Sequence, residues 1–297
     1  MNKRSLKVGL VQQAVASNDK NLSWARSAEQ VSDLAKQGCE LVMLQELHST
    51  LYFCQQENTD FFDLAEPIPG PATDYFAELA AKLNIVLITS LFEKRGSGLY
   101  HNTAVVFDRQ LGMVGKYRKM HIPDDPGFYE KFYFTPGDMG FQPIQTSVGK
   151  LGVLVCWDQW YPEAARLMAM DGADMLFYPT AIGWDKNDTA EEQTRQHDAW
   201  QTIQRSHAVA NSLPVIVANR TGFETSPVEG DSGIQFWGQS FIAGPQGEIL
   251  AKASFDKEEN LMVEVDLDRT EQIKRIWPYF RDRRIDAYDD LTKRWRD

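Results

Sequence analysis

Cysteine is scarce in this sequence, and its three thiols show no paired spacing. Cys39, Cys54 and Cys156 are the cysteines of a 297-residue chain. A disulfide framework of the kind found in secreted proteins has an even set of cysteines, which this chain lacks. Its first residues, MNKRSLKVGLVQQAV, contain no apolar signal segment before the first predicted strand. We therefore expect reduced thiols and a cytoplasmic protein.

Long apolar runs and basic blocks are also absent. No segment approaches the roughly 18 consecutive apolar residues that a membrane-spanning helix needs. The net charge is −11, and basic residues cluster only in a mixed-charge tail at the end of the chain. This composition argues against nucleic acid and membranes as partners, and an acidic protein can favour a cationic small molecule.

Several motifs of cofactor-dependent and serine enzymes are missing. The five histidines form no HxH or HExxH pattern, there is no CxxC, and neither a Walker A sequence nor a GxGxxG after a strand occurs. We therefore expect no metal site, and nucleotide binding lacks support. The sequence GDSG at 230–233 imitates a protease nucleophile motif, but it lies in a predicted Gly-rich loop (219–236) of an α/β chain. We interpret it as a turn, and a serine hydrolase centred on Ser232 stays a remote alternative.

Apolar strands alternate with amphipathic helices along the whole chain, which predicts an α/β fold. Two hairpins, VVFDRQLGMVGKYRK and FIAGPQGEILAKAS, look alike, and no Pro-, Gly- or Ser-rich linker divides the halves. We expect a duplicated sandwich in one domain over residues 1–297, with 268–297 as a C-terminal extension. The main predicted helices are 21–37, 73–83, 162–170, 190–211 and 269–277, and the main predicted strands are 7–12, 41–44, 85–92, 101–107, 114–118, 150–155, 174–178, 215–218, 240–243, 248–251 and 261–265.

One stretch, LGVLVCWDQWYPE at 151–163, places a cysteine between a strand and a helix. A β-branched apolar run ends at Cys156, and Pro162 then opens an amphipathic helix. The free N–H groups of that helix would favour a thiolate and bind an oxyanion. A buried structural cysteine explains the position equally well, so other residues have to decide.

Two more chemically active residues directly follow predicted strands. Glu46 comes two residues after the apolar run 41–44, and Lys119 follows the strand 114–118. Open α/β sheets bind ligands at the carboxyl ends of their strands, so these side chains can meet Cys156 there. The three types divide the work of acyl transfer, with Cys156 as nucleophile, Glu46 as base and Lys119 as oxyanion stabiliser.

These residues lie in segments that resemble a known family. LQEL around Glu46, KYRKMHIP around Lys119 and LGVLVCWDQWYPEAAR around Cys156 are similar in order and spacing to the signature segments of the nitrilase (carbon–nitrogen hydrolase) superfamily. The resemblance implies a four-layer αββα sandwich that hydrolyses a non-peptide C–N bond without a cofactor. It also implies that Glu130, in GFYEKFYFTPGD, matches a second family glutamate that positions Lys119 or the substrate amide.

Within the superfamily, HIPDDPGFYEKFYFTPGD, CWDQWYPEAARLMA and PTAIGWD resemble the subgroup that hydrolyses N-carbamoylputrescine, a small cationic ureido compound. Asp158 and its neighbours stand where hydrolases of carboxylate substrates tend to carry arginines. A distal ammonium instead needs carboxylates and aromatic walls. Asp185 matches a subgroup position, usually glutamate, that receives the amine. Asp125 is a second candidate, and Tyr52 and Trp157 are expected to line the channel.

Other readings stay open at this point. A β-ureidopropionase or an ω-amidase would use the same chemistry on another substrate, and a catalytically idle structural member would use none. The resemblance also implies a homodimer or a larger homo-oligomer, for which the aromatic, charged residues 268–297 are expected to supply subunit contacts.

Overall fold

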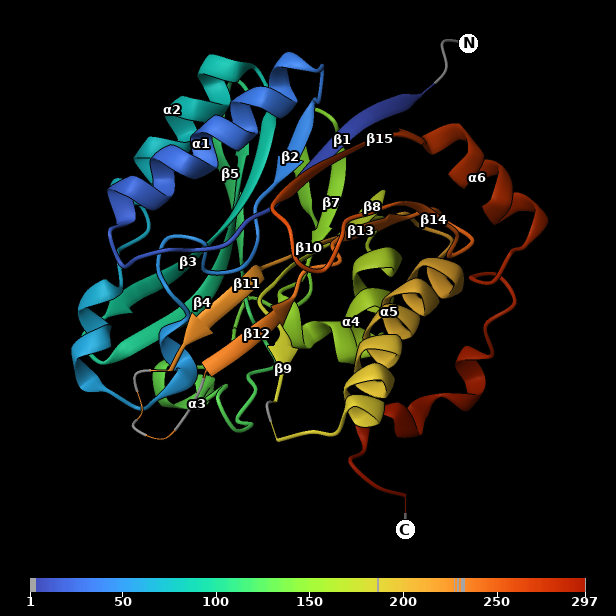
Figure 1. The fold of residues 1–297 in the computed structure, drawn as a ribbon. Coiled ribbons are helices and arrows are strands. Elements are labelled where there is room, and N and C mark those ends of the chain that lie inside the picture. Colours follow the sequence, from blue (N-terminus) through green and yellow to red (C-terminus); the bar gives the residue numbers. More distant parts are fainter. Residues whose placement is uncertain (1–3, 186, 227, 229, 231–232, 297) are drawn as a thin grey trace.

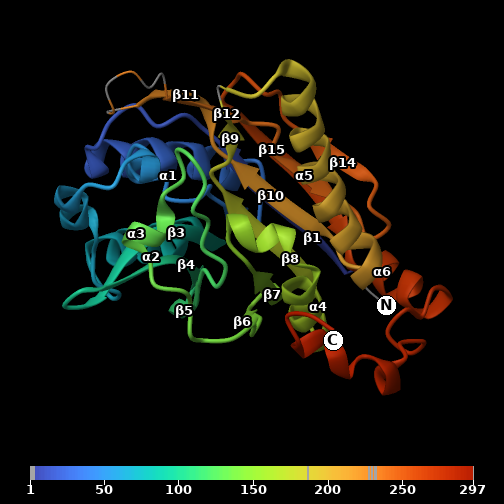
Figure 2. The ribbon, with the colours of Figure 1, turned by 90° about the horizontal axis from the view of Figure 1, so that it is seen from below.

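Two β-sheets lie face to face between two pairs of helices (Figure 1). The computed structural model describes residues 4–185, 187–226, 228, 230 and 233–296. Helices α1 and α2 cover the first sheet, and α4 and α5 cover the second, as the view in Figure 2 separates them. This arrangement is the predicted αββα sandwich. The helices are α1 (Lys20–Lys36), α2 (Pro71–Leu83), α3 (Glu130–Tyr133), α4 (Pro162–Met170), α5 (Ala190–Asn211) and α6 (Leu267–Ile276).

The first sheet has the strand order β15-β1-β2-β3-β4-β5, and the second has β14-β13-β10-β8-β7-β6. A small third sheet, β11-β12-β9, lies beside them. The strands of the first sheet are β15 (Glu259–Asp266), β1 (Ser5–Gln12), β2 (Leu41–Met43), β3 (Val86–Gly96), β4 (Leu99–Asp108) and β5 (Gly112–Arg118). The others are β14 (Ile249–Lys252), β13 (Phe241–Ala243), β10 (Val215–Asn219), β8 (Met175–Thr180), β7 (Gly149–Val153), β6 (Ile144–Thr146), β11 (Thr221–Thr225), β12 (Gly233–Trp237) and β9 (Gly183–Trp184).

The two large sheets repeat one topology. In each, three parallel strands (β1-β2-β3 and β7-β8-β10) have an antiparallel strand on one side. On the other side each has an antiparallel hairpin, β4-β5 or β13-β14. These are the two hairpins whose sequences look alike. The predicted internal pseudo-symmetry is therefore present in the strand order.

The core between the sheets explains why these segments form strands. Leu6, Val8 and Leu10 of β1 alternate along one face and pack into the same buried cluster as Val153 and Phe177 of the second sheet. Such period-two burial of β-branched and aliphatic side chains is what stabilises a half-buried strand. A second cluster, which includes α1, α2 and the outer face of the first sheet, holds those helices in place.

Helix bounds follow the local capping residues, and α1, α2 and α6 begin one or two residues before their predicted starts. Helices α4 and α5 have the predicted bounds, and α2 ends at Asn84, which adopts a left-handed conformation with φ of 55°. Helix α1, however, begins at Lys20, because the side chain of Asp19 rather than that of Asn21 accepts a hydrogen bond from the Leu22 N–H at 3.2 Å.

The predicted loop 219–236 is instead partly strand. Residues 221–225 and 233–237 pair in antiparallel register as β11 and β12, and β12 also pairs with β9. The glycines that suggest a loop allow this close pairing. A Cβ on Gly233 would lie 2.1 Å from the Glu224 carbonyl oxygen, which no side chain permits.

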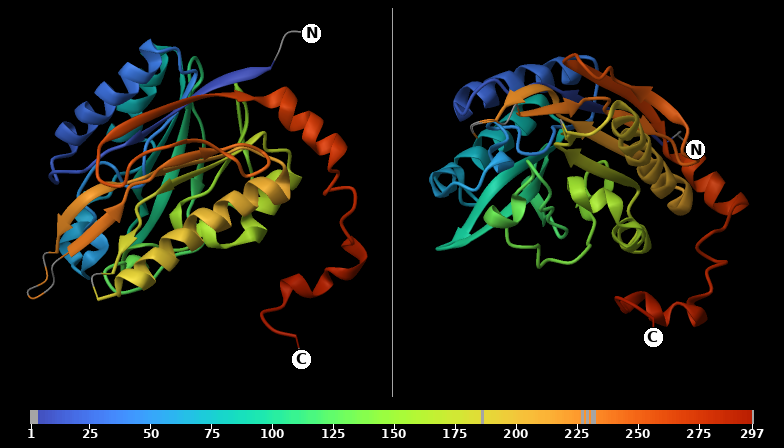
Figure 3. Two further views of the ribbon diagram at one scale, coloured as in Figure 1. Left: turned by 45° about the vertical axis from the view of Figure 1, so that its right-hand side comes forward. Right: turned by 60° about the horizontal axis from the view of Figure 1, so that its bottom comes forward.

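The chain after α6 forms a tail that stands off from the two sheets (Figure 3). Two short 3₁₀ turns, Ile285–Ala287 and Asp289–Thr292, are its regular structure. Its contact with the body includes the guanidinium of Arg166, which lies 4.7 Å from the centre of the Phe280 ring. Apolar side chains of this tail are solvent-exposed, among them Trp277, Ile285, Leu291 and Trp295.

Candidate active site

Cys156 lies at the carboxyl end of the β7 segment and opens a five-residue 3₁₀ helix, η3 (Cys156–Trp160). Its φ is +43°, a left-handed conformation that costs a non-glycine residue about 1–2 kcal/mol. The residue is buried, with a relative exposure of 3%. A strained, buried backbone at a thiol is a feature of nucleophile turns, where the surrounding fold has to hold the conformation.

The resting thiol is neutral, which corrects the prediction of a helix-favoured thiolate. Burial raises the pKa of Cys156 well above its usual range, and Glu46 raises it further against the opposing charge of Lys119. Cys156 also begins its own short 3₁₀ helix, so it lies six residues before Pro162, where α4 starts. Deprotonation of this thiol therefore needs a base close by.

Lys119, Glu46 and Glu130 form a fully buried cluster of charges. The Lys119 Nζ donates to Glu46 Oε1 at 2.8 Å and to Glu130 Oε2 at 2.7 Å. Glu46 follows β2, Lys119 follows β5, and Glu130 opens the helical turn α3 in the long loop after β5. The sequence analysis placed these three residues near Cys156, and the charges of all three affect its pKa.

The two oxygens of Glu46 have different surroundings. Oε1 accepts hydrogen bonds from Lys119 and from the Asn102 amide, the latter at 2.7 Å. Oε2 is buried and has no hydrogen-bond partner within the described part of the chain. A buried carboxylate oxygen without a partner is costly unless it serves a reaction. Oε2 is thus the atom available to take a proton.

The ammonium of Lys119 remains charged. Burial alone would lower the pKa of Lys119, but the charges of Glu130 and Glu46 outweigh it and raise that pKa well above its usual range. Two of its three N–H groups are used by these carboxylates, so one remains for a substrate oxygen. Burial also raises the pKa of Glu130 to about 7, although the Lys119 charge opposes that rise.

Tyr52 stabilises the cluster through a hydrogen bond to Glu130. Its hydroxyl donates to Glu130 Oε1 at 2.7 Å, and its relative exposure is 1%. Tyr52 is predicted to line the channel, but it lies against Glu130 instead, because the loop after β2 folds inward over that carboxylate. Its pKa is raised well above the usual range by burial and by Glu130, so the hydroxyl stays a donor.

A cavity of about 590 Å³ opens beside Cys156. Its lining includes Glu130, Trp157, Asp125 and Asp185, so four residues predicted for the site share one space with the cysteine. The Trp157 ring packs edge-to-face on Trp160, with 6.2 Å between ring centres. The described lining residues also include further charged groups: Asp188, Glu192 and Arg195.

Sequence reasoning missed Asp158 as a structural residue of the site. Its buried carboxylate accepts from the Val155 N–H at 2.9 Å and the Tyr117 hydroxyl at 2.9 Å. It also accepts from the N–H of His121 at 3.0 Å and lies 2.7 Å from its Nδ1. Asp158 therefore fixes the turn that presents Cys156. An acidic residue next to a nucleophile in a mostly apolar segment was the signal for this role.

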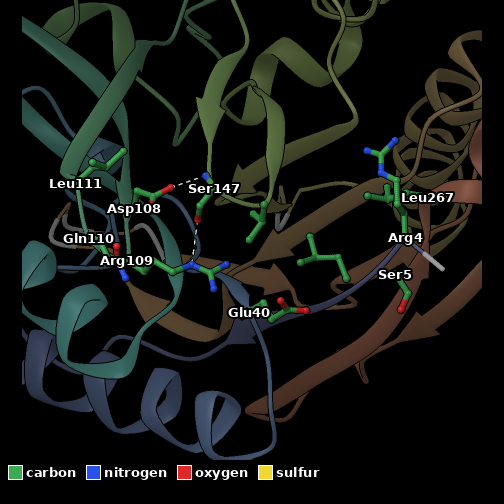
Figure 4. Close-up of a pocket in the computed structure, with 11 residues that line it drawn as sticks. Arg4, Ser5, Glu40, Asp108, Arg109, Gln110, Leu111, Ser147 and Leu267 are labelled. Carbon is green, nitrogen blue, oxygen red and sulfur yellow. Dashed lines mark hydrogen bonds between the residues drawn. The ribbon is translucent and has the colours of Figure 1, made fainter. Parts of the chain in front are cut away.

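A second cavity, of about 550 Å³, lies at the opposite ends of the strands (Figure 4). Arg4 and Ser5 precede or begin β1, and the turn after β4 contributes Asp108 and Arg109. Arg109 donates to the Ser147 hydroxyl at 3.0 Å, and the Ser147 N–H donates to Asp108 at 2.6 Å. Figure 4 shows Asp108, Arg109 and Ser147 joined by these hydrogen bonds, with Arg4 and Ser5 apart from them on the other side of the cavity. We place the chemistry at Cys156.

The described residues also bear on other types of site. They contain no group of three or more His, Cys, Asp or Glu side chains suited to a metal ion. Within the same ranges, no helix has both the length and the apolar character to cross a bilayer. Ser232, the remote serine candidate, lies outside the described residues.

Comparison with known proteins gives consistent matches over nearly the whole chain. A family model described as carbon-nitrogen hydrolase matches residues 7–275. An N-carbamoylputrescine amidase of Oryza sativa subsp. japonica is 44% identical over 263 residues, which cover 88% of this chain and 86% of that protein. A citrullinase of Francisella tularensis subsp. tularensis is 39% identical over 293 residues, 98% of this chain and 99% of that one. A crystal structure of a carbon-nitrogen hydrolase from Helicobacter pylori is 55% identical, with a TM-score of 0.94 over 98% of this chain and 100% of that chain.

Proposed function

Because this chain belongs to the carbon–nitrogen hydrolase family and Cys156, Lys119 and Glu46 meet beside an acid-lined cavity, we propose that it hydrolyses N-carbamoylputrescine. The products are putrescine, carbon dioxide and ammonia. One observation supports this type of reaction above the others. The Oε2 of Glu46, which has no hydrogen-bond partner among the described residues, lies in the same buried cluster as a neutral thiol. That pairing supports nucleophilic catalysis assisted by a base.

In the first half of the reaction, Glu46 takes the Cys156 proton as the sulfur attacks the ureido carbon. The remaining N–H of Lys119 and the backbone N–H of Trp157 hold the oxygen that becomes negative. The C–NH₂ bond then breaks, and Glu46 returns the proton so that ammonia leaves. An N-alkyl thiocarbamate remains on the sulfur, and Glu130 keeps the Lys119 ammonium in place.

In the second half, Glu46 removes a proton from water, which attacks the thiocarbamate carbon. The C–S bond breaks, the thiol regains a proton, and the N-alkyl carbamic acid is released. This acid loses carbon dioxide to give the amine. Each half uses the same base and the same oxyanion donors, so one buried cluster serves both steps.

The charges around the cavity support a substrate with a positive far end. Asp125, Asp185, Asp188 and Glu192 line it, and Arg195 is its one cation within the described residues. Arg195 is already paired, since it donates to Glu191 and, at 3.3 Å, to Glu192. A net negative rim attracts an ammonium and repels a carboxylate.

Citrulline is the second candidate substrate, because its ureido group is the same and its far end carries both an ammonium and a carboxylate. Arg195 could meet that carboxylate if its pairs with Glu191 and Glu192 opened. The 39% identity to a citrullinase supports considering it. The Arg195→Gln variant separates the two cases, since it should lower kcat/KM for citrulline and leave carbamoylputrescine hydrolysis intact or improved.

An ammonia-release assay over a small panel tests the proposal. The panel is N-carbamoylputrescine, citrulline, carbamoyl-β-alanine and a dicarboxylate monoamide. We expect kcat/KM for N-carbamoylputrescine to exceed each of the others by at least about tenfold, or about 1.4 kcal/mol of transition-state binding. An equal or higher value for any carboxylate substrate would overturn the substrate assignment. Turnover of none would favour an idle member of the fold.

We further propose that residues 268–297 contact a second subunit. The exposed apolar side chains of this segment support the proposal, with Trp295 at 81% relative exposure. Apolar side chains gathered on a segment that stands off from its own core commonly mark an interface. Association through this segment would cover Ile285, Leu291 and Trp295.

A further inference from the structure

A fully buried arginine, Arg220, holds the turn that carries Glu46. It lies between β10 and β11, on a different sheet from β2. Its Nη2 donates to the Leu47 carbonyl at 2.7 Å, to the Thr50 carbonyl at 3.2 Å and to the Glu46 carbonyl at 3.4 Å. One guanidinium therefore binds three backbone carbonyls of a five-residue turn.

This turn needs an external partner because its backbone is strained. Leu47, the residue directly after Glu46, has a φ of +48°, a conformation that a leucine rarely adopts. The Leu47 N–H donates to a side chain, the Ser90 hydroxyl, at 3.2 Å. The contacts of Arg220 keep the carbonyls of this turn pointing inward. They thereby fix the direction in which the Glu46 side chain projects from the backbone.

Glu224, the ion-pair partner of Arg220, is connected through Tyr52 to Glu130, the second carboxylate of the site. Arg220 Nη1 donates to Glu224 Oε1 at 2.5 Å, and both side chains are buried. The other oxygen of Glu224 accepts the N–H of Tyr52 at 2.6 Å. Tyr52 in turn donates its hydroxyl to Glu130. The guanidinium also lies over the Phe236 ring, 5.3 Å from its centre.

We propose that the Arg220–Glu224 ion pair positions both carboxylates of the catalytic cluster. It sets Glu46 through the carbonyls of the turn 46–50, and it sets Glu130 through the backbone and hydroxyl of Tyr52. Neither residue of the pair is among those that line the cavity, so both are positioning residues and not catalytic ones. This inference rests on the roles of Glu46 and Glu130 in the proposed function, but not on the identity of the substrate.

Two conservative variants test the pair. Arg220→Lys keeps the charge but cannot bind Glu224 and three carbonyls at once, since it lacks the planar fork. Glu224→Gln keeps the shape but loses the charge that holds Arg220. In both variants we expect kcat to fall at least about tenfold while KM changes less than about threefold. Here kcat is normalised to the amount of titrated Cys156 thiol in folded protein. Glu248→Gln, which breaks the Arg269–Glu248 pair in the β13–β14 turn, at the opposite ends of the strands from the cluster, is the matched control and should leave kcat unchanged.

A double-mutant cycle shows whether Glu224 acts through Tyr52. Tyr52→Phe removes the hydroxyl whose hydrogen bond lowers the pKa of Glu130, so the acid limb of the kcat/KM profile should move to higher pH. Glu224→Gln should shift that limb in the same direction. In the Tyr52→Phe background, the effect of Glu224→Gln on kcat should shrink by at least about threefold. Additive effects, or losses that merely track the unfolded fraction, would overturn the proposal.

A measurement without substrate separates this inference from the proposed function. The alkylation rate of Cys156 by chloroacetamide at pH 7, read from the Cys156 peptide, depends on Glu46 as base whichever amide the enzyme uses. Cys39 and Cys54 are on other peptides and act as internal references. We expect Arg220→Lys to slow Cys156 alkylation at least about fivefold. If wild type hydrolyses no panel substrate, the proposed function fails, and an unchanged alkylation rate in the variant would overturn the positioning role independently.

Discussion

At the scale of single residues, the cluster keeps its thiol protonated and its ammonium charged until substrate arrives. Burial raises the pKa of Cys156, and the carboxylates keep Lys119 charged against the effect of burial. Three residues of the site were predictable because each follows an apolar run that is typical of a strand: Cys156, Glu46 and Lys119. Asn102 and Arg220 were not, since their partners are brought together only by packing of distant strands.

Glu130→Gln should abolish most activity and should make the stability of the fold less dependent on pH between about 4.5 and 7. The folded-state pKa of this carboxyl, about 7, lies above its ordinary 4.5, so ionisation opposes folding. Its contribution to the free energy of unfolding is therefore largest below about pH 4.5 and is lost as the pH rises to 7, by on the order of 3 kcal/mol. Urea unfolding at pH 5 and pH 8 measures this. Glu264→Gln, on an exposed strand position, is the control, and a Glu130→Gln variant that loses as much stability as wild type between pH 5 and pH 8 would contradict the prediction.

Asp185→Asn should weaken recognition of the distal ammonium. Asparagine preserves the oxygen that accepts from the Asn187 N–H at 2.8 Å, so the loop should keep its shape while the charge is lost. We expect KM for N-carbamoylputrescine to rise about tenfold, and KM for uncharged N-butylurea to stay constant. Asp125→Asn should have a smaller effect, since Asp125 is the more exposed of the two. Equal changes in KM for both substrates would mean that Asp185 does not bind the ammonium.

At the scale of elements, the turn η3 depends on Asp158. This carboxylate accepts from Val155 within the turn and from Tyr117 and His121 outside it. Asp158→Asn would direct an amide N–H at one of these donors, so we expect a loss of about 2–4 kcal/mol in the free energy of unfolding. It should also lower kcat by displacing Cys156. Asp171→Asn, in an exposed pair with Lys150, should change stability by less than about 1 kcal/mol. Denaturant unfolding and steady-state assays measure both.

Elements with strong local signals were predicted well, and those defined by distant partners were not. Helices α4 and α5 have the predicted bounds because Pro162 starts one and the side chain of Thr189 caps the other. β11 and β12 were missed, since their glycines suggest a loop and their pairing with β9 is a tertiary contact. The same limit applies to Tyr52, whose loop gives no local sign that it folds over Glu130.

At the scale of the whole molecule, the duplicated topology brings the ends of strands from both sheets to one place. Glu46 and Lys119 come from the first sheet and Cys156 from the second. The similar hairpins predicted this duplication, because each half had to build an equivalent sheet. They did not predict the third sheet or the charged cavity rim on α5, where Glu192 and Arg195 lie.

The tail prediction also belongs to this scale. Replacing Ile285, Leu291 and Trp295 together by serine should reduce the subunit number, because these side chains are exposed within one protomer. Light scattering after size-exclusion chromatography measures the mass. Leu111→Ser, at an equally exposed apolar position in the β4–β5 turn, should leave the mass unchanged. An unchanged mass of the triple variant would contradict a role of this segment in association.

The central claim is that Cys156 attacks the ureido carbon and that ammonia leaves first. Rapid quenching of the enzyme with N-carbamoylputrescine, followed by mass analysis of the Cys156 peptide, tests it most directly. The account predicts an adduct equal to the substrate minus ammonia, and no adduct in the Cys156→Ser variant. A bare carbamoyl group on Cys156 would show that putrescine leaves first, and an adduct on Cys54 or on no residue would contradict the assignment of the nucleophile.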